Sequence, residues 1–344
     1  MISIIGSFSI EEEFVQIPSS AMKNRAKLLK ACACALTQNL GLESGEHVLI
    51  VTDGVKGTIG ELFREAASGL AERVDLLAIP VPSRNGEEPP AHVAERMSNV
   101  DVVLIPTSKS LSWTEARLRA TAKGVRIASM PGITEEIILR TFMADYESIR
   151  NRVNHLCDLM DETAVIRVVT DLGTDLTMNV TDRRGRGRNG GIYSEASAWG
   201  NLPCGEAFIA PLEGSCEGEY VVDAAQSGVG ELRSPISVLV NCGKAVDFRG
   251  GAEAAELAQL IRSVGNEEAY NIAELGIGCN ETASSKSITL EAEKALGTCH
   301  IAIGSNHLFG GTVEVNVHLD GVIRSPTIYF DGEVILEKGK FSVA

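Results

Sequence analysis

The stretch HVLIVTDGVKGTIGELFREAASGLAERVDLLAIPV, residues 47–81, decides the class of fold. Its first part, 47–53, is a short run of apolar, β-favouring residues, and 58–73 carries apolar residues at helical spacing. A second apolar run follows at 74–81. Strands that alternate with amphipathic helices predict a β-α-β unit, in which helices cover both faces of a parallel sheet.

The same alternation extends on both sides of this unit. We expect a helix at 21–39 that ends before Gly41, because glycine commonly follows the last turn of a helix. Residues 1–160 should therefore form an N-terminal α/β domain with a parallel sheet. Its further expected elements are helices at 91–99 and 113–124, strands at 100–107 and 125–131, and helical stretches from Thr134 to Asp161.

The second half of the chain, from Thr163, has a different pattern. Apolar and polar residues alternate with period two, and Gly and Asp separate the runs, which is typical of antiparallel strands and hairpins. Helical spacing recurs only near 253–264 and 289–296. We therefore expect a mixed, β-rich α+β domain at 161–344. Its strand-like runs are AVIRVVT, DLTMNVT, EAFIAP, SVLVNCG, EVNVHLDGVI and PTIYFDGEVIL.

The charge balance restricts the partners. The 344 residues include 31 Lys and Arg against 46 Asp and Glu, a formal charge of −15. This argues against nucleic acid and anionic membranes, which are bound mainly through Lys and Arg. The acidic N-terminus lacks the basic start of a signal peptide, and no apolar run approaches the roughly 18 residues of a membrane helix. We expect a cytoplasmic protein whose eight cysteines, which include no CxxC pair, stay reduced.

The strand-like stretch VEVNVHLDGVI, residues 313–323, has one apolar and one polar face. Glu314, Asn316, His318 and Asp320 share the polar face. An imidazole and a carboxylate two residues apart on a strand point the same way, which allows both to bind one metal ion. The alternative is a solvent-facing strand of an antiparallel sheet.

Three further ionisable residues stand alone in apolar or glycine-rich surroundings. They are Glu206 in NLPCGEAFIAP, Glu274 in AELGIG and His300 in TCHIAIG. Burial of such a group is costly unless a partner or a metal compensates its charge. Singly, each could instead be a surface residue or a core histidine bound by a backbone carbonyl. With His318 and Asp320 they form a set of the type that holds one or two divalent ions.

Several motifs follow one another in a specific order. They are SKSLSWTEAR (108–117), NLPCGE (201–206), AELGIG (273–278), EKALGTCHIAIG (293–304), FGG (309–311) and VHLDGVIRSPTIYFDG (317–332). In this order they resemble the thermophilic-type metallo-aminopeptidases, the family of aminopeptidase T and aminopeptidase S (peptidase family M29). The resemblance covers roughly the whole chain. It implies an N-terminal α/β domain, a C-terminal mixed domain with a two-metal site, and a homodimer.

The resemblance further implies a hydrolase, an aminopeptidase that removes N-terminal residues from short peptides. Two divalent ions, Zn, Co or Mn, would bind a water between them, lower its pKa and polarise the scissile carbonyl. Glu206 or Glu293 would carry the proton to the leaving amine. The metal ligands carried over by motif are Glu206, Glu274, His300, His318 and Asp320, with Glu293 as a sixth.

Two departures from the peptidase pattern leave alternatives open. Where the peptidases have a tyrosine shortly after the motif histidine, this chain has His307. The resemblance also extends to the 2,5-dihydroxypyridine dioxygenases, which hold one Fe(II) with two histidines and one aspartate. In that alternative His300, His318 and Asp320 would bind iron, and a small aromatic molecule would be the substrate. That pattern has a histidine at the position of Glu274, so the glutamate favours the hydrolase. A third reading is a degenerate member without enzymatic activity.

The loop DRRGRGRNGG, residues 182–191, concentrates arginines in an acidic protein. Arg183, Arg184, Arg186 and Arg188 could clamp a substrate carboxylate as a mobile lid. The alternative is a solvated hairpin loop whose arginines pair with surface acids.

Overall fold

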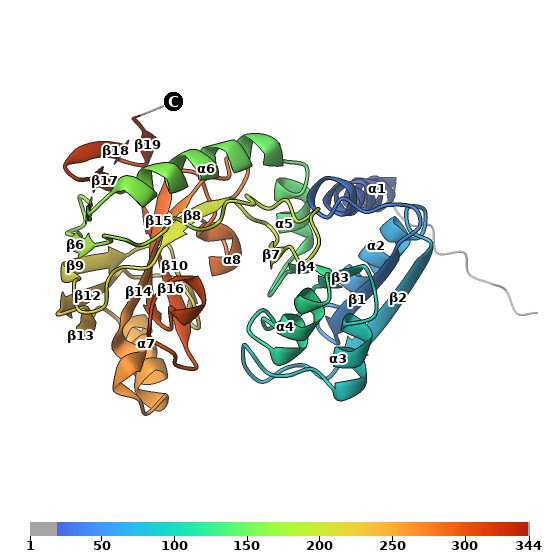
Figure 1. Cartoon of the computed structure of the whole chain (residues 1–344), viewed down its shortest axis with the longest axis horizontal. Coiled ribbons are helices and arrows are strands. Elements are labelled where there is room, and N and C mark those ends of the chain that lie inside the picture. The colour runs from blue at the N-terminus through green and yellow to red at the C-terminus, as the bar shows by residue number, and fades with distance from the viewer. Residues whose placement is uncertain (1–18, 343–344) are drawn as a thin grey trace, which may run out of the picture.

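Five strands form a parallel sheet in one lobe of the protein, on the right in Figure 1. The computed structural model describes residues 19–342, and the order of this sheet is β2-β1-β3-β4-β7. All neighbouring strands in it run parallel, so the expected α/β class is confirmed. The strands are β1 (His47–Asp53), β2 (Arg73–Ile79), β3 (Val102–Ile105), β4 (Arg126–Ser129) and β7 (Trp199–Asn201).

Helices cover both faces of this sheet because alternate residues of a strand point to opposite sides. Val48 and Ile50 of β1 belong to one buried cluster with residues of α1, α2 and α5. Leu49 and Val51 belong to a second cluster with residues of α3 and α4. The helices are α1 (Ser19–Cys34), continued by the π-helix η1 (Ala35–Asn39), α2 (Gly57–Ala67), α3 (Ala91–Met97), α4 (Glu115–Ala122) and α5 (Glu135–Thr141).

The first expected helix ends where the sequence predicts, whereas the second ends earlier than expected. η1 ends at Asn39, and Gly41 has a φ of +54°, the left-handed conformation that glycine adopts after a helix. The helix expected at 58–73 is shorter, because α2 ends at Ala67 and a turn containing Gly69 follows.

Two antiparallel sheets form the other lobe, as the period-two pattern predicts. Their orders are β11-β10-β16-β15-β14-β8 and β13-β12-β9-β6-β5-β17-β18-β19. The strands are β5 (Val165–Val169), β6 (Asp175–Asn179), β8 (Glu206–Ile209), β9 (Glu217–Val222), β10 (Ala225–Gln226), β11 (Gly230–Glu231), β12 (Ile236–Asn241), β13 (Lys244–Arg249), β14 (Ile272–Gly278), β15 (Thr298–Gly304), β16 (His318–Arg324), β17 (Thr327–Phe330), β18 (Glu333–Glu337) and β19 (Lys340–Phe341).

The two antiparallel sheets share one buried apolar cluster. Ile166 and Leu176 of the eight-stranded sheet belong to it together with Ile277 and Ile301 of the six-stranded sheet. Helix α6 lies along this lobe in Figure 1. The helices and 3-10 turns here are α6 (Tyr146–Glu162), α7 (Ala252–Ser263), η2 (Glu267–Tyr270), α8 (Thr289–Ala292) and η3 (His307–Phe309).

The predicted strand that contains His318 is shorter than expected, because β16 begins only at that residue. The carbonyl of Val313 accepts a hydrogen bond from the backbone N–H of Asn306, which binds the preceding segment to a loop instead of a strand. The expectation that Glu314 and Asn316 share a strand face with His318 is therefore wrong. Both side chains are exposed.

Strand β7 crosses the division expected near residue 160. It follows α6 in the chain but pairs with β4 in the parallel sheet. Trp199 of β7 packs edge-on against Trp113 at 5.8 Å, and the Arg117 guanidinium lies 3.8 Å above the Trp199 ring. The separation of the chain into 1–160 and 161–344 stays a prediction, and β7 is the segment that would have to detach.

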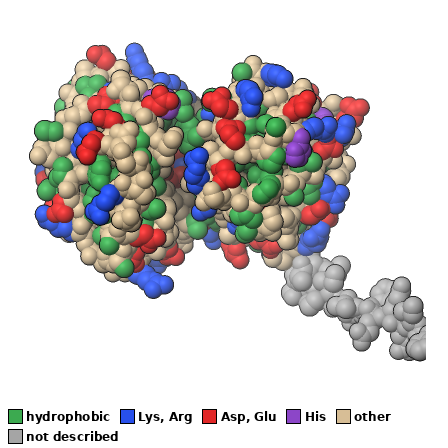
Figure 2. Space-filling model, turned by 90° about the horizontal axis from the view of Figure 1, so that it is seen from below, with side chains coloured by type: hydrophobic (Ala, Val, Ile, Leu, Met, Phe, Trp, Pro, Cys, Tyr) green, Lys and Arg blue, Asp and Glu red, His purple; other side chains and the backbone are tan. Residues whose placement is uncertain are grey.

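Acidic and basic side chains are interspersed over both lobes (Figure 2). All eight cysteines are free thiols, and most are buried. Within residues 19–342, no helix is long and apolar enough to cross a membrane. The acidic N-terminal segment, from which we predict that no signal peptide is present, lies outside the described residues.

An ion pair between the exposed Arg140 and the buried Glu291 joins the two lobes. Arg140 of α5 donates from Nε and a terminal nitrogen to the carboxylate of Glu291 in α8, at 2.6 and 2.7 Å. Glu291 is fully buried and also accepts a hydrogen bond of 2.9 Å from the backbone N–H of Ser284. The carboxylate therefore has its cationic partner only while α5 stays docked.

We predict that Arg140→Met lowers the free energy of unfolding by about 3 kcal/mol, since it leaves the buried Glu291 carboxylate without its cation. Arg64→Met is the matched control, because Arg64 forms an exposed pair with Glu61 that contributes about 0–1 kcal/mol. Urea denaturation of the two variants measures the difference. Equal midpoints would show that the interlobe pair contributes nothing beyond a surface ion pair.

Candidate metal centre

One face of the six-stranded sheet carries ionisable side chains, while the other face belongs to the apolar core. On β14, Glu274 lies on the polar face and Leu275 in the core cluster, and on β15 His300 alternates with Ile301 in the same way. A β-bulge between Ile272 and Glu274 shifts the register of β14 against β15. A bulge of this kind re-aims the side chain that follows it, here the glutamate.

The antiparallel register places these side chains next to one another. Glu274 lies opposite Ala302 of β15, and Ala302 lies opposite Asp320 of β16. His318 precedes Asp320 by two residues and shares its face, as expected. Glu206 begins β8, the neighbour of β14 on its other side. The sheet thus gathers the residues that the sequence selected: Glu206, Glu274, His300, His318 and Asp320.

Gly276 makes room for the imidazole of His300. The two residues lie opposite each other in β14 and β15, and a methyl group at Gly276 would overlap the ring. Any residue larger than glycine would therefore force the imidazole off the polar face. The glycine of the AELGIG motif has a steric role that its position in a strand does not reveal.

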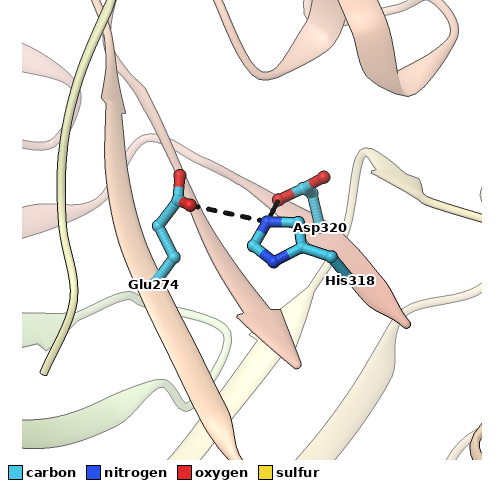
Figure 3. Close-up of side chains that lie close together, drawn as sticks. All are labelled: Glu274, His318 and Asp320. Carbon is cyan, nitrogen blue, oxygen red and sulfur yellow. Dashed lines mark ion pairs between the residues drawn. The ribbon is translucent and has the colours of Figure 1, made fainter. Parts of the chain in front are cut away.

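Glu274, His318 and Asp320 form a group that could hold a metal ion (Figure 3). One ligand atom of each lies within 4.8 Å of the others. His318 Nε2 is 3.4 Å from Glu274 Oε2 and 3.2 Å from Asp320 Oδ1. Imidazole nitrogen and carboxylate oxygen are the donors that divalent transition metals take in proteins.

Neighbouring groups orient two members of this group. His318 Nδ1 lies 2.8 Å from the carbonyl of Ser305, so a hydrogen on Nδ1 donates to that carbonyl and Nε2 is free for a metal. The hydroxyl of Ser227 donates to Asp320 Oδ2 at 3.4 Å, and Gln226 Nε2 donates to the Asp320 carbonyl at 3.1 Å. Contacts of this kind fix the direction in which a metal ligand points.

His300 and Glu206 extend the group along the sheet. His300 Nε2 lies 3.1 Å from Glu274 Oε1 and 3.7 Å from Glu206 Oε2. Glu206 Oε2 and His300 Nδ1 are buried and find no hydrogen-bond partner among the described residues. Buried polar atoms without a partner are costly. Their unmet bonding capacity fits a site that takes up a cation.

Lys294 belongs to the same cluster, although the sequence analysis did not select it. Its side chain is 2% exposed, and Nζ lies 2.5 Å from Glu206 Oε1 and 2.6 Å from Glu293 Oε1. Glu293, the sixth ligand expected by resemblance, therefore contacts an ammonium. The criterion that selected Glu274, a charged residue in apolar surroundings, would have found Lys294 in the run AEKALG.

The histidines and the lysine offset the cost of burying the carboxylates. Burial raises the pKa of Asp320 and of Glu274, but the neighbouring imidazoles outweigh it and hold both values below the ordinary range. Burial lowers the pKa of His300, yet its hydrogen bond with Glu274 and the nearby carboxylates raise it to about 9. For Glu293, burial prevails over the adjacent Lys294 and raises the pKa to about 7.

The cluster is closed on one side and open on the other. The side chains of His300 and Lys294 are 1% and 2% exposed, whereas those of Glu206, His318 and Asp320 keep 15%, 18% and 17%. A small molecule can therefore approach the latter three residues. The buried pair lies beneath them.

His307, which stands where the peptidases have a tyrosine, lies in the loop that orients His318. Its Nδ1 is 2.9 Å from the hydroxyl of Ser305, the residue whose carbonyl binds the His318 ring. Its Nε2 is 3.9 Å from Glu314 at the surface. The imidazole of His307 is thus outside the group of Glu274, His318 and Asp320.

The arginine-rich loop is held to the protein by ion pairs. Arg183 pairs with Glu213 at 2.5 Å, and Arg188 pairs with Asp158 and Asp161 of α6. Arg184 also pairs with Asp161. The pairs of Arg184 and Arg188 agree with a loop whose arginines bind surface acids, whereas the pair of Arg183 with Glu213 is largely buried.

Comparisons with known proteins connect the chain to a dioxygenase family. The family model described as "NicX: 2,5-dihydroxypyridine 5,6-dioxygenase" matches residues 27–343. The 2,5-dihydroxypyridine 5,6-dioxygenase of Pseudomonas putida KT2440 is 26% identical over 166 residues, 43% of this chain and 46% of that protein. The sequence match therefore spans about half the length of this curated relative.

Two solved structures share the fold. The 2,5-dihydroxypyridine dioxygenase of Pseudomonas putida KT2440 has a TM-score of 0.79 at 19% identity and covers 93% of this chain and 98% of its own. Wild-type AmpT of Thermus thermophilus has a TM-score of 0.69 at 18% identity and covers 93% and 100%. The fold shared with aminopeptidase T agrees with the resemblance of the motifs.

The expectation of a metallo-aminopeptidase is wrong. The family model and the curated relative are both described as a dioxygenase, an oxidoreductase, and the likeness to AmpT shows only the fold. The glutamate at position 274 misled the sequence argument, because we took it as favouring a hydrolase. The expected metal dependence itself is supported by the group of Glu274, His318 and Asp320.

We predict that Gly276→Ala weakens the binding of Mn²⁺ by about tenfold or more, because the added methyl group displaces the His300 ring from the cluster. Gly45→Ala is the matched control, since no atom lies within 4 Å of the added methyl position there. Isothermal titration of both variants gives the affinities. If the two bind Mn²⁺ equally well, the His300 imidazole has no part in the site.

Proposed function

The chain belongs to the 2,5-dihydroxypyridine 5,6-dioxygenase family, and from this membership we propose that it is an Fe(II)-dependent dioxygenase that opens a dihydroxylated aromatic ring. The name of the curated relative supports the same reaction class and 2,5-dihydroxypyridine as the substrate to test first. Among the functions that the sequence left open, this is the dioxygenase alternative, in which a single Fe(II) is bound.

The observation that carries the proposal is the donor group on the polar face of the sheet. Glu274, His318 and Asp320 bring three ligand atoms within 4.8 Å of one another, and two buried polar atoms beside them have no partner in the described part of the chain. A site with few protein ligands leaves positions open for oxygen and substrate. The donor set therefore fits one divalent ion of the Fe(II) type.

His318 and Asp320 would hold the metal in either arrangement that the site allows. The third ligand would be Glu274, whose oxygen already faces His318 and which stands where the family pattern has its second histidine, or His300, whose ring contacts Glu274. When bound, Fe(II) supplies positions at which oxygen and the aromatic ring meet and exchange electrons. The protein supplies the orientation, through the Ser305 carbonyl behind His318 and Ser227 behind Asp320.

An aromatic row lies beside the ligand group and suits a planar substrate. Phe208 of β8 and Phe309 of η3 pack edge to face with ring centroids 5.6 Å apart, and Phe309 packs in the same way on the His318 ring at 5.6 Å. Such a wall gives an aromatic substrate an apolar surface next to the metal ligands.

We predict that protein loaded anaerobically with Fe(II) consumes one molecule of oxygen for each molecule of 2,5-dihydroxypyridine that disappears, because a dioxygenase places both oxygen atoms in its product. An oxygen electrode and the ultraviolet absorbance of the ring measure the two quantities. His318→Ala should lose its iron and lower the rate by at least about a hundredfold, since it removes a ligand and not merely an outer contact.

His155→Ala is the control for this experiment, because His155 is exposed on α6 and contacts none of the ligands. It should keep both iron and rate. Iron-loaded protein that leaves every dihydroxylated aromatic intact, under conditions where the Pseudomonas enzyme turns over, would contradict the proposal.

We also propose that the protein works as a homodimer, as the motif resemblance implies. Trp113 and Val81, exposed at 43% and 52% of their surface, offer apolar area on the lobe with the parallel sheet. Light scattering after gel filtration tests this proposal. A mass of two chains is expected, and a mass of one chain would contradict it.

A further inference from the structure

Lys294 is a buried lysine inside the cluster. The proposed reaction gives its ammonium no role. Lys294 follows α8, its side chain is 2% exposed, and its ammonium contacts the carboxylates of Glu206 and Glu293 at 2.5 and 2.6 Å. A lysine is almost never buried without such partners. The pairing fixes the ammonium at one place between two carboxylates.

A continuous row of contacts connects this ammonium to the metal group. From Lys294 the row passes to Glu206, from there to His300 at 3.7 Å, and on to Glu274 at 3.1 Å. Glu274 belongs to the group with His318 and Asp320. The row therefore has one cation position at each end. The ammonium of Lys294 fills the position between Glu206 and Glu293, and the metal group forms the other.

The carboxylates of the cluster explain why a second positive charge is needed. Glu206, Glu274, Glu293 and Asp320 lie in one largely buried cluster, and one divalent ion cannot balance four ionised carboxylates when the histidines bind it as neutral imidazoles. A pair of divalent ions could do so. An ammonium supplies the same sign of charge and three N–H donors, but it offers no coordination position.

We propose that the Lys294 ammonium occupies the place between Glu206 and Glu293 where a second metal ion would otherwise bind, and that this lysine is what limits the site to the single ion of the proposed function. The inference rests on the proposed metal dependence and deepens it. It differs from the expectation of two ions per chain, because two of the six ligands expected by resemblance already pair with the lysine. It assigns Glu293 and the Oε1 oxygen of Glu206 to the ammonium and leaves Glu206 Oε2 free to face the bound ion.

The first experiment counts metal ions. Wild-type protein, Lys294→Met and Lys294→Arg are dialysed against Mn²⁺ and analysed by mass spectrometry for metal per chain. We expect one ion in the wild type, two in Lys294→Met, whose methionine frees the Glu206 and Glu293 carboxylates, and one in Lys294→Arg, which keeps the charge. Two ions in the wild type, or one in folded Lys294→Met, would overturn the inference.

Lys56→Met is the matched control for the loss of a partly buried lysine. The ammonium of Lys56 donates to the carbonyls of Gly132 and Ile133 at 3.1 and 2.9 Å and contacts no carboxylate of the cluster. This variant should bind one ion. A second ion in Lys56→Met would show that added metal reflects a loosened fold, and would overturn the role of Lys294.

A measurement on the wild type decides the matter if Lys294→Met does not fold. Electron paramagnetic resonance of Mn²⁺-loaded protein distinguishes an isolated ion from a spin-coupled pair. We expect the signal of isolated ions at every loading, and a coupled pair would overturn the inference. Failure of the dioxygenase assay with one ion bound would reject the proposed reaction and leave the role of Lys294 standing, so the two proposals fail separately.

Discussion

The site depends on mutual charge compensation within one buried face of a sheet. Carboxylates on β8, β14 and β16 lie next to imidazoles and an ammonium, and each ionic group contacts at least one of opposite sign. Removal of charged groups from water costs several kcal/mol each unless partners of this kind are present. The alternation of the strands makes the arrangement possible, because it directs the residues next to these groups in the chain, such as Leu275 and Ile301, into the core.

The short segment from Glu291 to Lys294 also connects the site to the other lobe. Within a few residues, Glu291 of α8 binds Arg140 of α5, whereas Glu293 and Lys294 turn into the cluster. The docking of the parallel-sheet lobe and the position of the ammonium therefore share one anchor. A disturbance of the interlobe ion pair should reach the cluster through only a few residues of backbone.

The sequence predicted the fold and part of the site because both follow from periodicity. Period two placed His318 and Asp320 on one face, and the alternation of strands and helices gave the parallel sheet. Period two also misled us at Glu314, since a hydrogen bond from Asn306 to Val313 holds this segment in a loop and the strand begins only at His318. Lys294 escaped notice because a lysine next to a glutamate resembles a surface pair, although the apolar residues around it in AEKALG already indicated burial.

The most direct test of a single metal beside a built-in ammonium is a crystal structure of Mn²⁺-loaded protein with anomalous diffraction. The account predicts one anomalous peak within bonding distance of His318 Nε2 and Asp320, with Lys294 still between Glu206 and Glu293. A second peak between Glu206 and Glu293, with the lysine displaced, would contradict it. So would the absence of any peak at His318 in crystals that hold stoichiometric manganese.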